Sequence, residues 1–249
     1  MKRSVPSHRA APAGEGERRP SGDGASSRAV VLLSGGLDST TALCWARAKG
    51  WGVAALAVSY GQRHVRELAS ARAVARRLGV PLHIVSLELP WLKVSSLVGR
   101  SRELPNVPLS SIGKGPIPST YVPGRNAVFL SLAASLADAI GAGAIVIGAN
   151  SMDFSGYPDC RPEFIRSFER TARLGTRLGA EGGKMRVLSP LQRLDKAGIV
   201  KLALGLKAPL GLTWSCYAGK AKPCGLCDSC KLRARGFAEA GVEDPYVQT

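Results

Sequence analysis

Residues 29–40 read AVVLLSGGLDST, and this stretch decides the fold of the chain. The apolar run 29–33 predicts a buried strand, the Ser-Gly-Gly after it predicts a turn, and the following residues predict the start of a helix. Two glycines let the backbone turn tightly and approach an anion with no Cβ in the way. The amides of the turn and of the first helical turn then converge on one point, to which the helix dipole adds positive charge. The stretch therefore predicts a phosphate-binding loop.

This loop is not of the Walker type, which needs GxxxxGK[ST] with a lysine on the β- and γ-phosphates. Here Asp38 follows the glycines in place of a lysine. An ordinary glycine-rich turn with a serine cap is the plain alternative. The string SGGLDST resembles the PP-loop of enzymes that split ATP between its α- and β-phosphates. The resemblance implies that Asp38 and Ser39 are catalytic and that ATP is bound by Leu33, Ser34, Gly35, Gly36, Leu37, Asp38, Ser39, Thr40, Thr41, Ala42 and Leu43.

The length of 249 residues allows one large domain, or one domain with a small appendage. We expect no membrane-spanning segment, because the sequence has no run of about 18 or more apolar residues. Residues 1–27 are rich in Ser, Pro, Gly and Arg and lack the apolar stretch of a secretory signal. They predict a disordered basic tail on a cytoplasmic protein. The rest divides into an expected α/β domain over 28–212 and a metal-binding segment over 213–249.

The formal net charge is +16 and the isoelectric point is near 10.1, which is typical of nucleic-acid-binding proteins. The charge is scattered along the chain, however, and is densest at Arg76-Arg77 and over 220–231. No aromatic residues interleave these positions as they do in single-strand binders. Because small anionic substrates explain a positive field equally well, we expect no direct nucleic-acid partner.

Four of the six cysteines crowd the C-terminal end with the spacing C-x7-C-x2-C-x2-C. This spacing brings four soft ligands within reach of one ion and favours zinc. A disulfide framework and an iron–sulfur cluster are the alternatives. Four ligands close the coordination shell, so the zinc would be structural. The predicted ligands are Cys216, Cys224, Cys227 and Cys230, and we expect Cys44 and Cys160 to be bystanders.

Between the glycine loop and the cysteines the chain alternates in the manner of βαβ units. Such units predict a doubly wound, Rossmann-like parallel sheet whose ligands lie at the carboxyl ends of the strands. The Pro/Gly/Ser-rich segment 90–123 is too long for a simple connector and is typical of a lid or binding loop. Further strands are expected over 53–59, 82–87, 144–147 and 185–188, and helices over 65–78 and 126–140, from Pro162, after Asp195, and over 228–240.

Two strings near the expected strand ends carry unusual side chains. In YVPGRN, Arg125 could clamp a carboxylate or phosphate at a helix start, and Asn126 follows it. In SGYPDCRPEF, Asp159 and the ring of Tyr157 suit a guanine-like base, since an acid accepts its N–H groups and an aromatic ring covers its face. The plain alternatives are a surface arginine with an Asn N-cap, and a rigid proline-flanked turn. Lys196 is either a counter-charge to pyrophosphate or a solvated lysine.

The longer strings make a family resemblance specific. SYGQRH at 59–64, YVPGRN at 121–126, GANSMDFSGYPDCRPEF at 148–164, TWSCYAG at 213–219 and CGLCDSCKLRARGF at 224–237 all resemble the 7-cyano-7-deazaguanine synthases of queuosine biosynthesis. The similarity runs from residue 28 to the C-terminus. The chain departs from the family at Asp138, where Glu is usual, and over 204–209.

The resemblance implies an ATP-dependent ligase that converts 7-carboxy-7-deazaguanine and ammonia to 7-cyano-7-deazaguanine. The carboxylate attacks the α-phosphate of ATP, ammonia displaces AMP to give an amide, and a second ATP activates the amide oxygen so that AMP leaves and the nitrile forms. Magnesium assists, the four cysteines hold zinc, and the enzyme is a homodimer. Substrate binding is implied for Arg125, Asn126, Asp153, Tyr157, Asp159 and Arg161, and a catalytic role for Lys196 beside Asp38 and Ser39.

Two other function classes share part of this pattern. A tRNA-modifying thiolase of the PP-loop group would use the same ATP site, but it would be expected to carry a tRNA-binding extension and often a redox-active cysteine. Cys160 is the candidate for that role outside the C-terminal group. A zinc-ribbon protein that keeps a nucleotide site for regulation is the non-enzymatic alternative. AMP release with the deazaguanine acid, with tRNA, or with neither separates the three.

Overall fold

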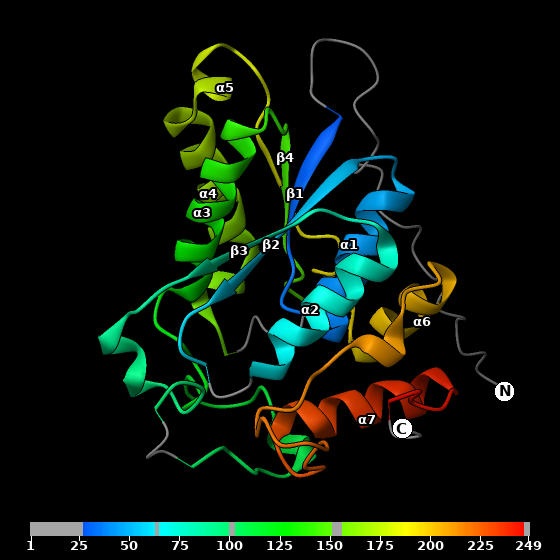
Figure 1. The fold of residues 1–249 in the computed structure, drawn as a ribbon. Coiled ribbons are helices and arrows are strands. Elements are labelled where there is room, and N and C mark those ends of the chain that lie inside the picture. The colour runs from blue at the N-terminus through cyan, green and yellow to red at the C-terminus, as the bar shows by residue number, and fades with distance from the viewer. Residues whose placement is uncertain (1–26, 63–64, 100–102, 151–155, 247–249) are drawn as a thin grey trace, which may run out of the picture.

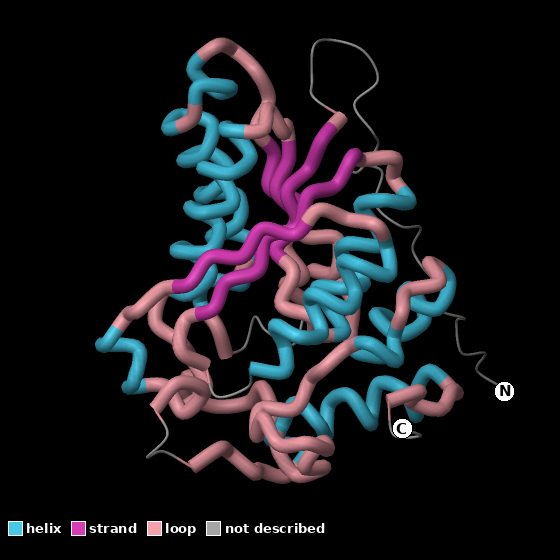
Figure 2. Tube along the Cα trace, viewed as in Figure 1, coloured by secondary structure: helices cyan, strands magenta, loops and turns pink. Residues whose placement is uncertain are grey.

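The computed structural model describes residues 27–62, 65–99, 103–150 and 156–246. Within them the chain forms one five-stranded sheet in the order β3-β2-β1-β4-β5, with every neighbouring pair parallel (Figure 2). This order confirms the predicted doubly wound sheet, since the chain runs outward from β1 in both directions. The strands are β1 (Arg28–Leu32), β2 (Gly52–Ser59), β3 (Leu82–Ser86), β4 (Ala144–Val146) and β5 (Arg186–Leu188).

Helices cover both faces of the sheet (Figure 1). On one face α1, α2 and α6 form a core with alternate residues of β1, and α7 joins it through Phe237. On the other face α3 and α4 pack against the remaining residues of β1 and against β4 and β5. The helices are α1 (Leu37–Ala48), α2 (Val65–Leu78), α3 (Arg125–Ala139), α4 (Pro162–Gly175), α5 (Arg177–Ala180), α6 (Lys196–Gly205) and α7 (Asp228–Ala240), with 3-10 turns η1 (Pro90–Val94), η2 (Leu109–Ser111), η4 (Pro158–Cys160) and η5 (Leu210–Leu212).

The central strand explains why apolar runs, and not alternating patterns, predict this sheet. Ala29, Val30 and Val31 of β1 are fully buried although their side chains point to opposite faces. A parallel strand covered by helices on both sides needs apolar residues at every position. All the expected strands and helices are present, and their ends lie within two residues of the predicted ends. At the edge of the sheet, β3 leaves Ile84 exposed.

The long segment 90–123 lies at the carboxyl ends of the strands and contains only short 3-10 turns among its described residues. Its two arms are joined by a hydrogen bond from Ser96 N to Ser119 O of 2.8 Å. The predicted boundary after residue 212 stays a prediction, and the expected tail 1–27 lies almost wholly outside the described residues. The segment after residue 212 first passes the glycine loop and then forms α7, which packs on α6.

Candidate active site

The loop between β1 and α1 has the shape that its glycines predict. Gly35 has a φ of +90°, and a Cβ there would overlap the carbonyl oxygen of Glu67 and crowd the amide of Ala71 on α2. No other residue fits this position without moving α2. The hydroxyls of Ser34 and Ser39 lie 3.0 Å apart, and the amide of Ser34 donates to Ser39 Oγ at 3.2 Å. Two hydroxyls are thus held at the start of α1 before any ligand binds.

Asp38, in the first turn of α1, is the point where three elements meet. Its Oδ2 accepts from Lys196 Nζ at 2.5 Å and from Asn150 Nδ2 at 2.9 Å. The loop after β4 comes this close because Gly148 has no side chain: a Cβ there would lie 3.0 Å from the backbone of Asp38 and Ser39. The other oxygen, Oδ1, is buried and has no hydrogen-bond partner in the described part of the chain. A buried carboxylate oxygen in this state is suited to a cation or to a donor on a ligand.

A cavity of about 620 Å³ opens beside this loop. It extends from the carboxyl ends of β1, β2 and β4 to the start of α3, the segment 105–120 and the first turns of α7. Its volume lies in the usual range for small-molecule sites. Of the predicted ATP-binding residues, those that line the cavity are Leu33, Ser34, Gly36, Leu37, Asp38 and Ser39. The others are buried outside its lining: Gly35, Thr40, Thr41, Ala42 and Leu43.

Arg125 brings a fixed positive charge to the lining of the cavity. It is the first residue of α3, where Gly124 in the left-handed conformation reverses the chain (φ +61°). Burial opposes its charge, but the hydroxyl of Tyr60, which shares a hydrogen bond with it, and the neighbouring Tyr157 raise the pKa of the Arg125 guanidinium above its usual value. Burial also raises the pKa of Tyr60, against the effect of Arg125. The site therefore holds a permanent cation next to a neutral phenol, a combination that suits an anionic group on a ligand.

The other predicted substrate residues are not all in the cavity. Asn126 and Tyr157 line it, and the Tyr157 hydroxyl shares a 2.8 Å hydrogen bond with Thr120 Oγ1. Asp159 is buried outside the lining, where its Oδ2 accepts from the backbone amide of Asn126 at 2.8 Å. Arg161 is the exposed N-cap residue of α4 and is also outside the lining. Asp153 lies outside the described residues.

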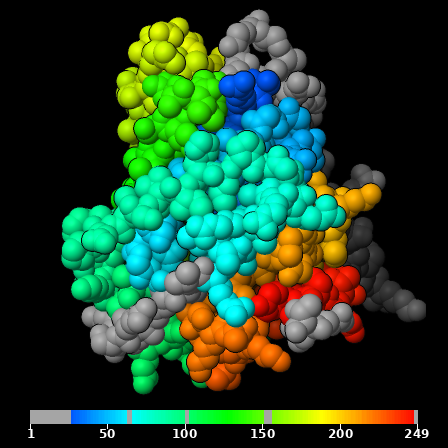
Figure 3. All heavy atoms as spheres, in the orientation of Figure 1, coloured from blue at the N-terminus to red at the C-terminus, as the bar shows by residue number. Residues whose placement is uncertain are grey.

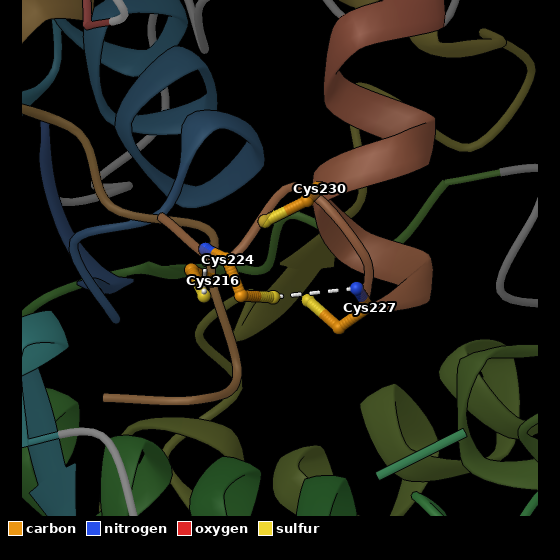
Figure 4. A group of neighbouring side chains, drawn as sticks. All are labelled: Cys216, Cys224, Cys227 and Cys230. Carbon is orange, nitrogen blue, oxygen red and sulfur yellow. Dashed lines mark hydrogen bonds between the residues drawn. The ribbon is translucent and has the colours of Figure 1, made fainter. Parts of the chain in front are cut away.

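The four C-terminal cysteines form a compact cluster, with their sulfur atoms facing one another (Figure 4). All four Sγ atoms lie within 4.8 Å of each other, close to the spacing of about 3.8 Å that a tetrahedral ion with Zn–S bonds of about 2.3 Å requires. Backbone amides donate to the sulfurs, including Cys224 N to Cys216 Sγ at 3.3 Å and Cys227 N to Cys224 Sγ at 3.3 Å. The donor set and its geometry fit one thiophilic metal ion.

The thiols of the cluster hydrogen-bond to one another, which changes their pKa values in opposite directions. Hydrogen bonds from the thiols of Cys227 and Cys230 lower the pKa of Cys216, and the contact with Cys216 raises the pKa of Cys227. A metal ion would supply the charge that deprotonates the thiols, which couples its binding to the local fold.

The segment that carries the cysteines is tied to the glycine loop and to the long loop. Trp214 N donates to Gly35 O at 2.9 Å, and the guanidinium of Arg66 lies 5.1 Å from the centre of the Trp214 ring. Figure 3 shows this segment, in orange, at the surface next to the cyan residues of α2. From α7, Lys231 Nζ donates to Asn106 Oδ1 and to Val107 O, both at 2.6 Å. The cysteine segment therefore forms one wall of the cavity.

Sequence reasoning missed several side chains that shape the site. Thr120 is a single hydroxyl in a loop, and its contact with Tyr157 depends on a fold-back that no local pattern shows. Arg233 is buried and forms a bidentate ion pair with Asp244, from Nε to Oδ2 at 2.6 Å and from Nη2 to Oδ1 at 2.8 Å. It also donates to Thr213 Oγ1. In the sequence, only the position of Arg233 within the family-like string CGLCDSCKLRARGF pointed to this residue. Among the described residues, no helix combines the length and apolar character needed to cross a membrane.

Known proteins resemble this chain over most of its length. The model of the family described as Queuosine biosynthesis protein QueC matches residues 28–241. A 7-cyano-7-deazaguanine synthase of Leptospira interrogans serogroup Icterohaemorrhagiae serovar copenhageni is 52% identical over 223 residues, 89% of this chain and 91% of that protein. One from Myxococcus xanthus is 52% identical over 225 residues, 89% of this chain and 97% of that protein. An NMN synthetase structure from Francisella tularensis gives a TM-score of 0.47 at 16% identity, covering 88% and 79% of the two chains, a likeness too distant to bear on ligand or reaction.

Proposed function

This chain belongs to the Queuosine biosynthesis protein QueC family, and from that premise we propose that it makes 7-cyano-7-deazaguanine from 7-carboxy-7-deazaguanine, ammonia and ATP. It is an enzyme of the ligase class, as its relatives at about half identity are. The observation that carries the proposal is one cavity lined by both the glycine loop and the Arg125 cation. That arrangement suits a reaction between a carboxylate and the α-phosphate of ATP.

In the first step the loop residues 34–39 hold the phosphates of ATP, and the start of α1 directs its amides and dipole at them. Lys196, beside Asp38, compensates the charge that develops on the departing pyrophosphate. Arg125 holds the acid so that its carboxylate meets the α-phosphate, which gives a mixed anhydride with AMP. Magnesium, when bound, would neutralise phosphate charge, and Asp38 Oδ1 is the oxygen suited to hold it.

In the second step ammonia attacks the anhydride carbonyl, and AMP leaves to give the amide. A second ATP then transfers its adenylyl group to the amide oxygen, pyrophosphate leaves, and loss of AMP and protons gives the nitrile. The same residues serve both adenylations, because the amide oxygen occupies the place of the carboxylate oxygen. No covalent bond to the protein is needed, so its task is orientation and charge compensation.

The metal in this proposal is one zinc ion held by the four cysteines, and its role is structural, since the set leaves no open position. We also propose that the enzyme is a cytoplasmic homodimer. The free edge of the sheet supports association, because Ile84 on β3 and Trp91 and Val94 on η1 are exposed apolar side chains close together in sequence. Sedimentation at micromolar concentration tests this part.

The test of function is AMP and pyrophosphate release by the purified chain with ATP, ammonia and one of three additions: the deazaguanine acid, unmodified tRNA, or neither. We expect release with the acid alone, with about two AMP formed per nitrile. Release that requires tRNA would favour a tRNA-modifying enzyme. Nucleotide binding without turnover under all three conditions would favour a regulatory protein.

A further inference from the structure

Helix α7 packs against the start of α6, where Gly236 lies on Lys196. A Cβ on Gly236 would lie 2.8 Å from Cβ of Lys196, closer than Cβ atoms approach other atoms in proteins, and 3.1 Å from the Lys196 carbonyl carbon, which is also a tight contact. Both residues lie within helices, so neither backbone can yield by itself. The neighbouring Phe237 is buried in the core that α6 and α7 share with the sheet. The absence of a side chain at Gly236 therefore sets how near α7 comes to the start of α6.

The start of α6 in turn decides where the ammonium of Lys196 lies. Lys196 follows Asp195, whose carboxylate caps the helix by accepting from Gly198 N at 2.8 Å. Its side chain is only 13% exposed and reaches Asp38 Oδ2 in the phosphate loop. A shift of the helix start therefore moves the ammonium away from Asp38 and from the phosphates that the loop would bind.

Helix α7 is itself anchored on three sides. The cysteine cluster holds its first turn through Cys227 and Cys230. Arg233 joins its middle to Thr213 Oγ1 at 2.8 Å and to Asp244. The segment before it donates from Trp214 N to Gly35 O, next to the residues that Lys196 faces. The segment from Trp214 through α7 thus contacts both the glycine loop and Lys196.

We propose that Gly236 is a positioning residue through which α7 places the Lys196 ammonium against Asp38 and the departing pyrophosphate. The proposal rests on the proposed function and deepens it, because it gives the cysteine segment a part in catalysis that a closed metal site cannot play itself. Gly236 touches no substrate, and its effect passes through Lys196.

The test is Gly236→Ala, with Gly205→Ala as its matched control. Gly205 is the last residue of α6, and a Cβ there would meet no atom within 4 Å. For Gly236→Ala we expect kcat for acid-dependent pyrophosphate release to fall about tenfold or more, with KM for ATP within about threefold of wild type. Gly205→Ala keeps the wild-type kcat. Unchanged kcat in Gly236→Ala overturns the proposal.

A double-mutant cycle separates positioning from a general structural effect. In the Lys196→Ala background, Gly236→Ala causes no further loss, because the ammonium it positions is absent. Losses that multiply in the double variant overturn the proposal. If Gly236→Ala does not fold, Asp244→Asn replaces it in the cycle. This change weakens the ion pair that anchors Arg233 of α7, lies outside the lining of the cavity and adds no atom at the interface, and the same non-additivity is expected.

A readout that needs no turnover keeps this inference distinct from the proposed function. Acetylation of Lys196 by a water-soluble acylating reagent, followed by peptide mass spectrometry, should be several-fold faster in Gly236→Ala than in wild type or Gly205→Ala. Equal rates in all three proteins overturn the positioning role. Wild-type protein that releases no pyrophosphate with the acid contradicts the proposed function alone, and the labelling rates still decide this one.

Discussion

Replacement of Asp159 separates two roles for its carboxylate, reading the base of the substrate and holding the start of α3. The sequence suggests the first, because an acid beside an aromatic residue suits a guanine-like base. The structure favours the second. Asp159 Oδ2 accepts from the amide of Asn126 at 2.8 Å, its carbonyl accepts from Asn126 Nδ2 at 3.2 Å, and the side chain does not line the cavity.

The size of the effect follows from this contact. Asp159→Ala leaves the Asn126 amide buried without this acceptor, which costs about 2 kcal/mol of the free energy of unfolding. In a chain of this size that loss lowers the melting temperature by about 4–8 °C. Asp159→Asn keeps an acceptor oxygen in the same place and loses only its charge, so we expect a fall of about 2–4 °C.

Calorimetric binding of the deazaguanine acid then decides between the roles. If Asp159 holds α3, Asp159→Asn binds the acid within about threefold of wild type, and Asp159→Ala binds it about three- to tenfold more weakly because Arg125 shifts with the helix start. A carboxylate that reads the base would lose about 1–3 kcal/mol of binding, or about 5- to 150-fold, in Asp159→Asn at an unchanged melting temperature. That second result refutes our reasoning. Arg161→Ala, exposed and outside the cavity, is the control and should change neither quantity.

Three further outcomes are expected. Asp38→Ala and Ser39→Ala should each lower AMP release by at least about 10²-fold with the fold intact, and near-normal turnover in Asp38→Ala would remove the loop from the site. The wild-type protein should contain about one zinc per chain. Cys227→Ser, or chelation of the wild-type protein, should lower both the zinc content and the melting temperature. A brown protein with iron and labile sulfide would contradict the zinc assignment. Hydrogen bonds from the backbone amides of Leu178 and Arg177 lower the pKa of Asp138 in the folded protein. The ionised carboxylate therefore stabilises the fold at pH values above its unfolded pKa of about 3.9. This stabilisation is lost as the pH falls through the pKa of Asp138 in the folded protein. Asp138→Ala should therefore be less stable in urea than wild type at neutral pH, and the difference should shrink below about pH 4.

The sequence predicted most where the information is local. The glycine loop is a contiguous string whose strand, turn and helix each have their own signal, and the structure forms all three in that order. The cysteine ligands lie within fifteen positions of one another, so their spacing alone limits how far apart the sulfurs can lie. Even the parallel sheet follows from apolar runs that only a strand buried on both faces explains.

Prediction was weakest where a residue's role depends on what packs against it. The sequence around Asp159 is the same whether its carboxylate faces a ligand or a helix start. The hydrogen bond from the Asn126 amide to Asp159 joins residues that are 33 positions apart in the sequence. Gly236 presents the same difficulty in another form, because a glycine inside a helix reads as a local weakness. Only the approach of a second helix shows that the missing side chain is what allows contact with Lys196.

The Asp38–Lys196 pair shows why this site is built across such distances. A lone lysine over phosphates would be mobile and well hydrated, and its charge would be partly screened before reaction. Here two helix starts that are 158 residues apart meet, and the lysine is held in a largely buried position against a carboxylate whose other oxygen has no partner among the described residues. The pair is therefore held together without a ligand, and in the proposed reaction little reorganisation would be needed when charge develops on pyrophosphate. If Gly236 positions Lys196 as proposed, residues that touch no ligand contribute to this orientation, and the segment after residue 212 then has a part in the chemistry as well as in the fold.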